Sequence, residues 1–350
     1  MTEIGNNKIL EWLKKRKRLL IGLGTVAIIL IMVFLVDFSS LIQKIITIGF
    51  WGLFLFVITY TIAFILRAYK MKLIFKGLDH NISYSTSYFS TVASFLINDS
   101  TPGKLGDIAK IFIVKDQENM RLSESVAGIA VERILDLLLL FLISCVALIY
   151  LYLGNFGTVG SKKILGQNLQ FYLAIGAIFL FVIISLLLLV IYKSEFVIKI
   201  SEKISTKLSD YLRRFIINFK EGFKKYKDHR KELLFIIILG FPTWFIDAFV
   251  VVIFFYLLGY QLNIFLLILA IILTFFSKIF PITPGGWGIS ENVGALFIFF
   301  FYPGIPFVEI LSIFIVDHLF RSAYLLFFGG YSIFHYNFSL KEIENIEEKL

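Results

Sequence analysis

Two stretches of the sequence place charged residues beside residues that break helices. The first, NDSTPGKLGD, runs from 98 to 107, and the second, PITPGGWGISE, runs from 281 to 291; both contain Thr-Pro-Gly-x-x-Gly. Proline removes a backbone donor and glycine permits a positive φ, so a helix is expected to stop at each stretch. The helix that follows then presents free N–H groups, which favour anions such as phosphate. The sequence therefore predicts two anion-binding helix ends.

The polar side chains in and beside these stretches are candidates for a binding cavity. Two cations near the two helix ends, Lys104 and Lys278, suit an anionic head group. The nearby acids could bind a cationic group or relay protons. A packing turn without a ligand is the alternative interpretation of each stretch. The candidates of the first stretch are Asn98, Asp99, Pro102, Gly103, Lys104, Gly106 and Asp107. Those of the second are Lys278, Thr283, Pro284, Gly285, Gly286, Gly288, Ser290 and Glu291.

A charged group follows each stretch, inside a run that is otherwise apolar. The first is VERILD, with Glu132, Arg133 and Asp136, and the second is VDHLFR, with Asp317, His318 and Arg321. Residues four apart share one face of a helix. Charges inside a membrane span are costly, so they usually face a cavity or a partner. The alternative interpretation is structural pairing, of Arg133 with a carboxylate and of Asp317 with Arg321. Both interpretations can hold, because a binding site also needs its charges neutralised when it is empty.

The composition indicates that these residues belong to a polytopic membrane protein. The chain has 350 residues, of which 58% are hydrophobic and only 17% are charged, and its mean hydropathy is +0.85. A soluble domain has more charge and could not hide such long apolar runs. The net charge of +9 lies in loops between these runs. It therefore indicates attraction to lipid head groups, and no nucleic acid partner is expected.

The apolar runs predict six spans, at 19–36, 45–66, 126–153, 171–192, 233–258 and 310–335. The run at 19–36 is long for a signal peptide and is interpreted as a retained span. Two further apolar regions, 84–114 and 264–301, are interrupted by the Thr-Pro-Gly stretches, and neither half is long enough to cross comfortably. They are predicted to be re-entrant hairpins; two full spans per region are the alternative.

Lys and Arg are concentrated at the N-terminus, in 67–83 and in 193–232, which places these segments inside. The first hairpin then enters from the cytoplasm, the second enters from outside, and both termini are cytoplasmic. Repeat 1 (45–153) and repeat 2 (233–335) would have opposite topology, as in many transporters. The fold class is an all-α polytopic membrane protein, with about six spanning helices and two re-entrant hairpins in an inverted repeat. The other parts of this single membrane domain, 1–350, are a basic flank with the first span (1–44), a connecting span (171–192), a cytoplasmic amphipathic segment or solvated linker (193–232) and an acidic tail (336–350).

The stretches TPGKLGD, VERILD and ITPGGWGISE resemble signatures of the lysylphosphatidylglycerol synthase transmembrane-region family of flippase-like membrane proteins. The resemblance covers about 19–335 and implies a role in lipid translocation, without identifying the lipid. Some members carry a soluble aminoacyl-transferase domain; because this chain ends at Leu350, we expect no such domain and no enzyme activity. Members often have Arg where Lys104 stands, and Lys keeps the charge without the planar fork.

The predicted function is translocation of an anionic, aminoacylated or polyprenyl-phosphate-linked lipid head group through a polar cavity between the hairpins. The expected partners are a membrane lipid with a phosphate head group and a separate lipid-modifying transferase. The main alternative is a non-transporting scaffold or regulator of such a transferase, docked through 193–232. A membrane enzyme acting on lipid phosphate is disfavoured, because no paired-Asp motif or His/Ser arrangement is present. With one cysteine and four scattered histidines, no metal or cofactor is expected.

Overall fold

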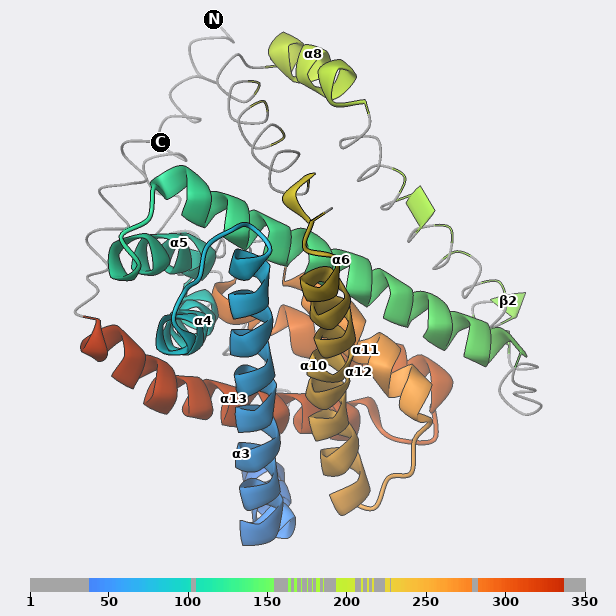
Figure 1. The fold of residues 1–350 in the computed structure, drawn as a ribbon. Coiled ribbons are helices and arrows are strands. Elements are labelled where there is room, and N and C mark those ends of the chain that lie inside the picture. The colour runs from blue at the N-terminus through green and yellow to red at the C-terminus, as the bar shows by residue number, and fades with distance from the viewer. Residues whose placement is uncertain are drawn as a thin grey trace, which may run out of the picture.

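The computed structural model describes residues 38–101, 105–153, 193–204, 228–278 and 283–336, together with scattered positions between 163 and 226. These residues form nine α-helices (Figure 1) and one antiparallel pair of two-residue strands, β1 (Lys163–Ile164) and β2 (Gln167–Asn168). Four helices are long and apolar enough to cross a membrane: α3 (Phe38–Lys76), α6 (Leu122–Leu153), α10 (Arg230–Leu257) and α13 (Phe307–His335).

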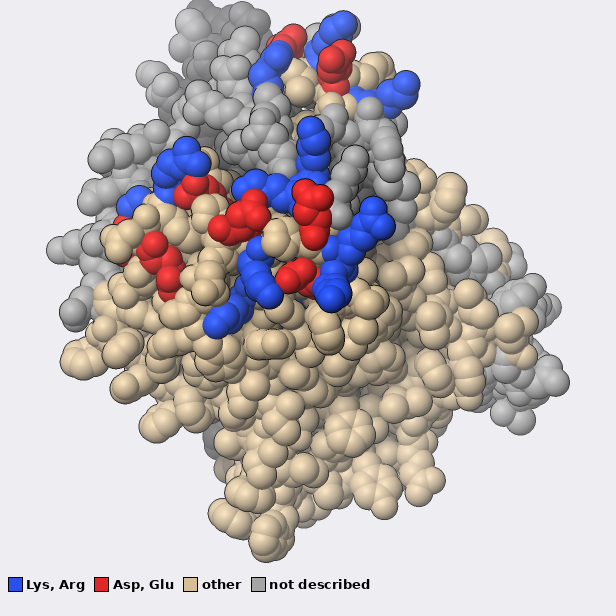
Figure 2. Space-filling model, viewed as in Figure 1, with Lys and Arg blue, Asp and Glu red and all other residues tan. Residues whose placement is uncertain are grey.

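These four helices confirm the predicted spans at 45–66, 126–153, 233–258 and 310–335. The predicted span at 19–36 lies outside the described residues, and only isolated positions of 171–192 lie within them. The surface agrees with a membrane location. Large apolar side chains are exposed along the helices, and Figure 2 shows charged residues gathered at the end of the molecule where α3 ends and α10 begins.

Helices α3 and α10 pack together and run in opposite directions (Figure 1). At one end, the Lys76 ammonium lies 3.0 Å from the carboxylate of Glu232, which is in the first turn of α10. At the other end, Gly52 of α3 lies against Leu257, and a Cβ on this glycine would come within 2.9 Å of the leucine methyl. The first long helix of each predicted repeat therefore forms the antiparallel centre of the fold.

A short hairpin of two helices follows each of these helices. The first hairpin consists of α4 (Tyr84–Ser100) and α5 (Leu105–Gln117), and the second of α11 (Ile264–Ser277) and α12 (Ile289–Phe301). Each helix has 13 to 17 residues and is therefore about 20–26 Å long, less than the roughly 30 Å of a bilayer core. The first helix of each hairpin begins after a polar N-cap residue, Ser83 for α4 and Asn263 for α11. The side chain of each cap accepts hydrogen bonds from backbone N–H groups of the first turn.

The packing of the helices has an internal two-fold pattern. Helix α4 packs on α13, and its counterpart α11 packs on α6; likewise α5 packs on α6, and α12 packs on α13. The contacts of α3 with α4, α6 and α13 are matched by contacts of α10 with α11, α13 and α6. The two halves thus share one scheme of helix contacts, and each half completes its packing with helices of the other.

The chain just before α10 forms a hydrogen bond with the end of α3 and ion pairs with the loop that follows α3. The Tyr226 hydroxyl donates to the carbonyl of Ile74 at 2.7 Å, and Lys225 and His229 pair with Asp79 at 3.1 and 2.9 Å. The hydrogen bond with His229, followed by that with Lys225, holds the pKa of the Asp79 carboxyl below its ordinary value. The C-terminal end of the predicted cytoplasmic segment, 193–232, therefore contacts the loop that follows α3.

Two contacts fix α5 in its place. The Lys110 ammonium is fully buried and lies 2.8 and 2.9 Å from the two carboxylate oxygens of Glu132 in α6. Gly106 packs against α4, where a Cβ would collide with the backbone carbonyl of Ser94 and would come within 2.8 Å of the Asn98 side chain. The first contact joins the hairpin to α6, and the second joins its two helices.

Replacing Lys110 alone should destabilise the protein strongly. Lys110→Met leaves the Glu132 carboxylate buried without its partner, a change that costs about 3–5 kcal/mol in comparable pairs. The double variant Lys110→Met/Glu132→Met should recover most of this loss, because two apolar side chains replace the pair. Unfolding by sodium dodecyl sulfate in mixed micelles measures both effects. If the two single losses simply add in the double variant, Lys110 and Glu132 do not act as a pair.

Adding one methyl group at Gly106 should also weaken the first hairpin. Gly106→Ala forces α4 and α5 apart, and overpacking of this kind typically costs about 1–3 kcal/mol. Gly304→Ala is the matched control, because a Cβ there meets open space. The same unfolding assay should show a loss for Gly106→Ala alone, and equal stability of the two variants would contradict the close packing of α4 on α5.

Candidate functional site

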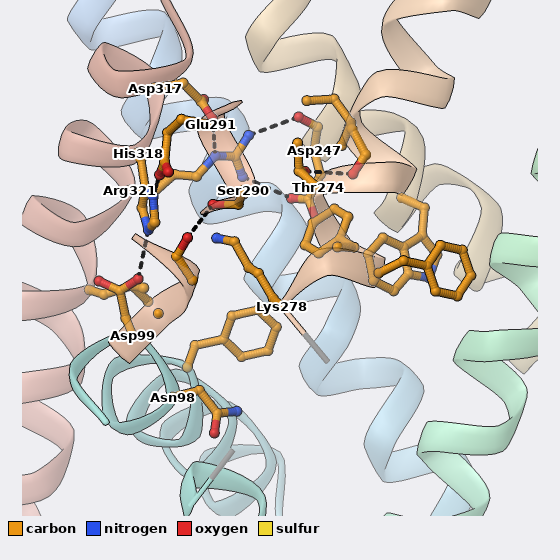
Figure 3. A pocket seen from close by; sticks show the side chains of 18 of the residues that line it. Asn98, Asp99, Asp247, Thr274, Lys278, Ser290, Glu291, Asp317, His318 and Arg321 are labelled. Carbon is orange, nitrogen blue, oxygen red and sulfur yellow. Dashed lines mark hydrogen bonds and ion pairs between the residues drawn. The ribbon is translucent and has the colours of Figure 1, made fainter. Parts of the chain in front are cut away.

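A cavity of about 430 Å³ lies between the two hairpins and the long helices. Its wall includes residues of both hairpins and of α3, α6, α10 and α13 (Figure 3). Apolar side chains such as Phe95 and Phe275 line part of it, and charged side chains line the rest. The cavity is therefore built by both halves of the chain together.

Twelve of the sequence-predicted site residues line this cavity: Asn98, Asp99, Asp107, Arg133, Asp136, Lys278, Thr283, Gly285, Gly286, Glu291, Asp317 and Arg321. Ser290 lines it as well. Four candidates, Gly106, Glu132, Pro284 and Gly288, are not part of its wall. Pro102, Gly103 and Lys104 lie outside the described residues. The binding role of each residue stays a prediction.

The tip of the second hairpin uses glycines where the backbone requires them. Pro284–Gly286 forms a short 3-10 turn, η1, in which Gly285 and Gly286 have φ values of 60° and 78°. Gly288 follows with a φ of 80° and starts α12. A side chain at these positions would strain the backbone. A Cβ on Gly286 would also come within 2.6 Å of the Lys278 side chain, so this glycine makes room for the lysine.

Protein side chains already occupy part of each helix end that was expected to bind an anion. The Glu291 carboxylate accepts the backbone N–H of Gly288 at 2.7 Å, and the Asn98 side-chain oxygen accepts that of Gly106 at 2.8 Å. These contacts satisfy donors that a helix N-terminus otherwise leaves free. These two backbone donors are therefore not free to bind an anion.

In the first half, the charged residues of the wall form pairs between neighbouring helices. Arg133 of α6 donates to Asp107 of α5 at 2.9 Å, and Asn98 of α4 donates to the same carboxylate at 3.3 Å. Asp136 of α6 pairs with Lys70 of α3, which lies behind the wall, and Arg133 is 3.7 Å from Asp136. The pairs hold α3, α5 and α6 together at the cavity.

In the second half, His318 of α13 lies between two carboxylates. One ring nitrogen contacts Glu291 of α12, and the other is 3.0 Å from Asp99 of α4 (Figure 3). Ser322 donates to the second oxygen of Asp99 at 2.5 Å. The His318 ring stacks on Trp287, with the ring centroids 4.0 Å apart. This cluster therefore joins the first hairpin to the second and to α13.

A second charged group connects α13 to the α3–α10 pair. Arg321 donates to Asp317 at 2.8 Å, donates to the carbonyl of Asp247 at the same distance, and lies over the ring of Tyr60. The Asp247 carboxylate pairs in turn with Arg67 of α3. Arg67 and Asp247 occupy equivalent places, each 17 residues before the first residue of its hairpin, Tyr84 or Ile264. The pair therefore joins the two halves at corresponding positions.

Lys278, at the end of α11, differs from the other cations of the wall. It forms no ion pair with any residue that the structure describes, and Figure 3 shows its side chain reaching into the cavity from beneath Ser290. Arg133 and Arg321, by contrast, each contact carboxylates. Lys278 is thus the described cation that is available to an anion entering the cavity.

Several buried polar atoms of the wall have no hydrogen-bond partner in the described structure: Arg133 Nε, Trp244 Nε1, Asp247 Oδ1 and Asp317 Oδ1. Such atoms are costly in a folded protein unless water or a ligand satisfies them. They include donors and acceptors, so the wall suits a head group that carries both kinds of polar atom. Within the described residues, no cluster of His, Cys, Asp and Glu could hold a metal ion.

Sequence reasoning missed some residues of this site. Asp247 was not singled out, although it is an isolated acid in the apolar run FPTWFIDAFVVV. The argument that selected VERILD and VDHLFR, charge inside a span, would have found it. His318 was noted only as a member of its group, and its partner Asp99 is 219 residues away in the chain. That contact has no local signal in the sequence.

Comparison with known proteins agrees with this fold and cavity. The family model described as the lysylphosphatidylglycerol synthase TM region matches residues 19–329. A UPF0104 membrane protein of Pyrococcus horikoshii is 24% identical over 302 residues, which cover 81% of this chain and 87% of the relative. A UPF0104 membrane protein of Methanocaldococcus jannaschii is 27% identical over 195 residues, covering 56% of this chain and 75% of that relative. No solved structure matches the chain.

The family match includes both Thr-Pro-Gly stretches and the charged groups after them, the residues on which the resemblance was based. It concerns the membrane region of the synthase family, and no catalytic domain is matched. Because the model covers most of the chain, this protein belongs to the lysylphosphatidylglycerol synthase TM-region family of multi-pass membrane proteins.

Proposed function

We propose that this protein is a lipid translocase that moves a phosphate-bearing head group through the cavity between its two hairpins. The observation that carries the proposal is the cavity itself: a charged space of about 430 Å³, built by both halves and lined by Lys278, whose ammonium forms no ion pair with any described residue. A head group crossing a bilayer must replace its water with other polar partners, because hydrocarbon offers none. The cavity supplies such partners at the centre of an apolar protein.

The breaks in the hairpins fit this function. Irregular backbone is tolerated at membrane depth only where protein buries it or where it lines a polar cavity. The tip of the second hairpin meets both conditions, because Thr283, Gly285 and Gly286 line the cavity and Thr283 is buried. A packing turn alone would not need a cavity lined by charged residues beside it.

The size and the chemistry of the cavity favour a head group over a whole lipid. Pockets that hold small molecules usually measure about 300–1,000 Å³, which a polar head group fits and a diacyl lipid does not. Lys278 would hold the phosphate, while Oδ1 of Asp247 and Oδ1 of Asp317, which accept no hydrogen bond in the described structure, would accept hydrogen bonds from hydroxyl or amino groups. The acyl or prenyl chains would remain in the bilayer. The family name makes an aminoacylated phospholipid one candidate cargo.

We further propose that the hairpins are re-entrant and that the two halves form an inverted repeat. Their helices are shorter than a bilayer core, the central helices α3 and α10 are antiparallel, and the helix contacts repeat in both halves. In transporters of this plan, one half moves against the other to expose the site to each side in turn. The Lys- and Arg-rich N-terminus and the segment 193–232 would be cytoplasmic.

This arrangement predicts which loops face each side of the membrane. In a Cys145→Ala background, a cysteine at the exposed Asn81, after α3, should react with a membrane-impermeant maleimide only from the cytoplasmic side. A cysteine at the exposed Gln261, after α10, should react only from outside. The measurement compares labelling of intact cells with that of inside-out vesicles. Labelling of both positions from one side would contradict the inverted orientation of the two halves.

Transport itself should depend on Lys278. The assay uses vesicles of phosphatidylethanolamine and phosphatidylglycerol that contain the purified protein and a trace of fluorescent phosphatidylglycerol or lysylphosphatidylglycerol, with dithionite reporting the outer leaflet. A charge-assisted contact is worth about 1.5–3 kcal/mol, so Lys278→Gln should slow transport about tenfold to hundredfold. Lys278→Arg should retain more activity than Lys278→Gln.

Lys115→Gln is the matched control for that experiment. Lys115 lies near the end of α5, is partly exposed and pairs with the neighbouring Asp116, so its loss should leave transport unchanged. Folding of each variant is checked by its elution as a monodisperse protein. If the folded wild-type protein moves none of these lipids, nor a polyprenyl phosphate, faster than protein-free vesicles, the proposed function is wrong.

A further inference from the structure

His318 contacts carboxylates with both of its ring nitrogens. Its Nδ1 meets Glu291 of the second hairpin, and its Nε2 lies 3.0 Å from Asp99 of the first hairpin. An ionised carboxylate can only accept hydrogen bonds, and a neutral imidazole has a single N–H to donate. Both contacts are therefore satisfied only if the ring carries two protons, or if one of the two carboxyl groups carries a proton itself.

In either case the three side chains hold one proton more than a neutral imidazole between two carboxylates. The Nε2 contact crosses between the halves, because Asp99 belongs to α4 while Glu291 and His318 belong to α12 and α13. Asp99, Glu291 and His318 all line the cavity, so the proton site borders the space through which the head group would pass. All three side chains are at least 87% buried, which strengthens their interaction.

We propose that lipid movement through this cavity is coupled to proton movement, with the Asp99–His318–Glu291 cluster as the proton site. The inference rests on the proposed translocase function and adds a second transported species, H⁺. One proton enters the cluster from the compartment that the cavity faces and leaves to the opposite compartment after the halves have moved. No bond other than those of this proton is made or broken.

The first half has a corresponding ion pair whose cation does not titrate. Arg133 is the third residue of VERILD, as His318 is the third residue of VDHLFR, and each pairs with an acid in the first turn of its hairpin's second helix, Asp107 or Glu291. An arginine side chain keeps its proton in proteins. The two halves therefore carry one permanent charge pair and one pair that can release a proton, which predicts one coupled proton for each cycle.

Loss of the proton would loosen the contact between the halves. Without it, one lone pair of the ring would face a carboxylate, and Asp99 and Glu291 would face each other with less compensating charge. The other charged groups around the cluster are Lys278 from the end of α11 and Asp317 and Arg321 on α13. Arg321 is held by Asp317 and Asp247, which leaves Lys278 as the nearby cation without an ion pair in the described residues.

A bound phosphate would compete for that remaining cation. When the head group pairs with Lys278, the two carboxylates of the cluster lose the compensating charge of the lysine, and the proton on the cluster becomes more strongly required. Lipid binding and proton binding would then favour each other, which is the condition for moving both in one step. After the halves separate, release of the lipid would allow release of the proton.

The test measures lipid distribution in the same vesicles under an imposed pH difference, with potassium and valinomycin holding the voltage at zero. For one coupled proton, a tenfold proton gradient should shift the steady-state ratio of lipid between the leaflets by about tenfold, and reversing the gradient should reverse the shift. His318→Arg keeps a positive charge between Asp99 and Glu291 without a proton to release. It should therefore abolish the shift, and His318→Gln should do so as well.

His80→Arg is the matched control, because His80 lies after α3, outside the cavity, and an arginine there can keep its contact with Glu124. This variant should retain the full shift. The coupling proposal is overturned if the wild-type protein moves lipid with no response to the pH difference, or if His318→Arg responds like the wild type. Absence of any lipid movement at any pH would instead overturn the translocase function, and the coupling with it.

Discussion

The centre of this protein depends on the pairing of charges that are buried away from water. An uncompensated charge in an apolar interior is unstable, so each such group needs a partner, and the partners come from different helices. This requirement fixes the orientation of each helix about its own axis and the positions at which the helices contact one another, because a small rotation of one helix would separate the paired charges. The pairs are Arg67–Asp247 between α3 and α10, Lys70–Asp136 between α3 and α6, Lys110–Glu132 and Arg133–Asp107 between α5 and α6, and His318 with Glu291 and Asp99 between α13, α12 and α4.

The same requirement distinguishes the cavity from the rest of the interior. Pairs such as Lys110–Glu132 are closed and serve the packing. Among the described residues, the cavity wall keeps one ammonium without an ion pair, that of Lys278, and several polar atoms without a hydrogen-bond partner. A wall that is only partly satisfied can accept polar groups from a ligand, which a fully paired wall cannot. The two halves agree in their helix contacts and differ at this wall, where Arg133 in one half corresponds to His318 in the other. The two sides of the cavity therefore share similar packing and differ in their chemistry.

Much of this organisation could be predicted from the chain. The apolar runs predict the four described spans, and the Thr-Pro-Gly stretches predict where the hairpins turn. The charged groups in VERILD and VDHLFR lead to five residues of the cavity wall, Arg133, Asp136, Asp317, His318 and Arg321. Glu132 was placed in the same set but pairs with Lys110 behind the wall, because neighbouring positions on a helix point about 100° apart and only packing decides which of them faces the cavity. Asp247 is a single acid in an apolar run, and charge inside a span is the sequence signal that marks it.

The sequence by itself determined the class of the protein, the positions of its long helices and the resemblance of its two halves, because hydrophobic run lengths, helix-breaking residues and repeated motifs are local properties of the chain. Only the tertiary structure decided that the two hairpins share one cavity, that Lys278 lines it without an ion pair to any described residue and that Asp99 contacts His318. These depend on contacts between distant residues, such as Asp99 and His318, which are 219 positions apart. Their geometry is set by the joint packing of all the helices, and no short stretch of sequence encodes it.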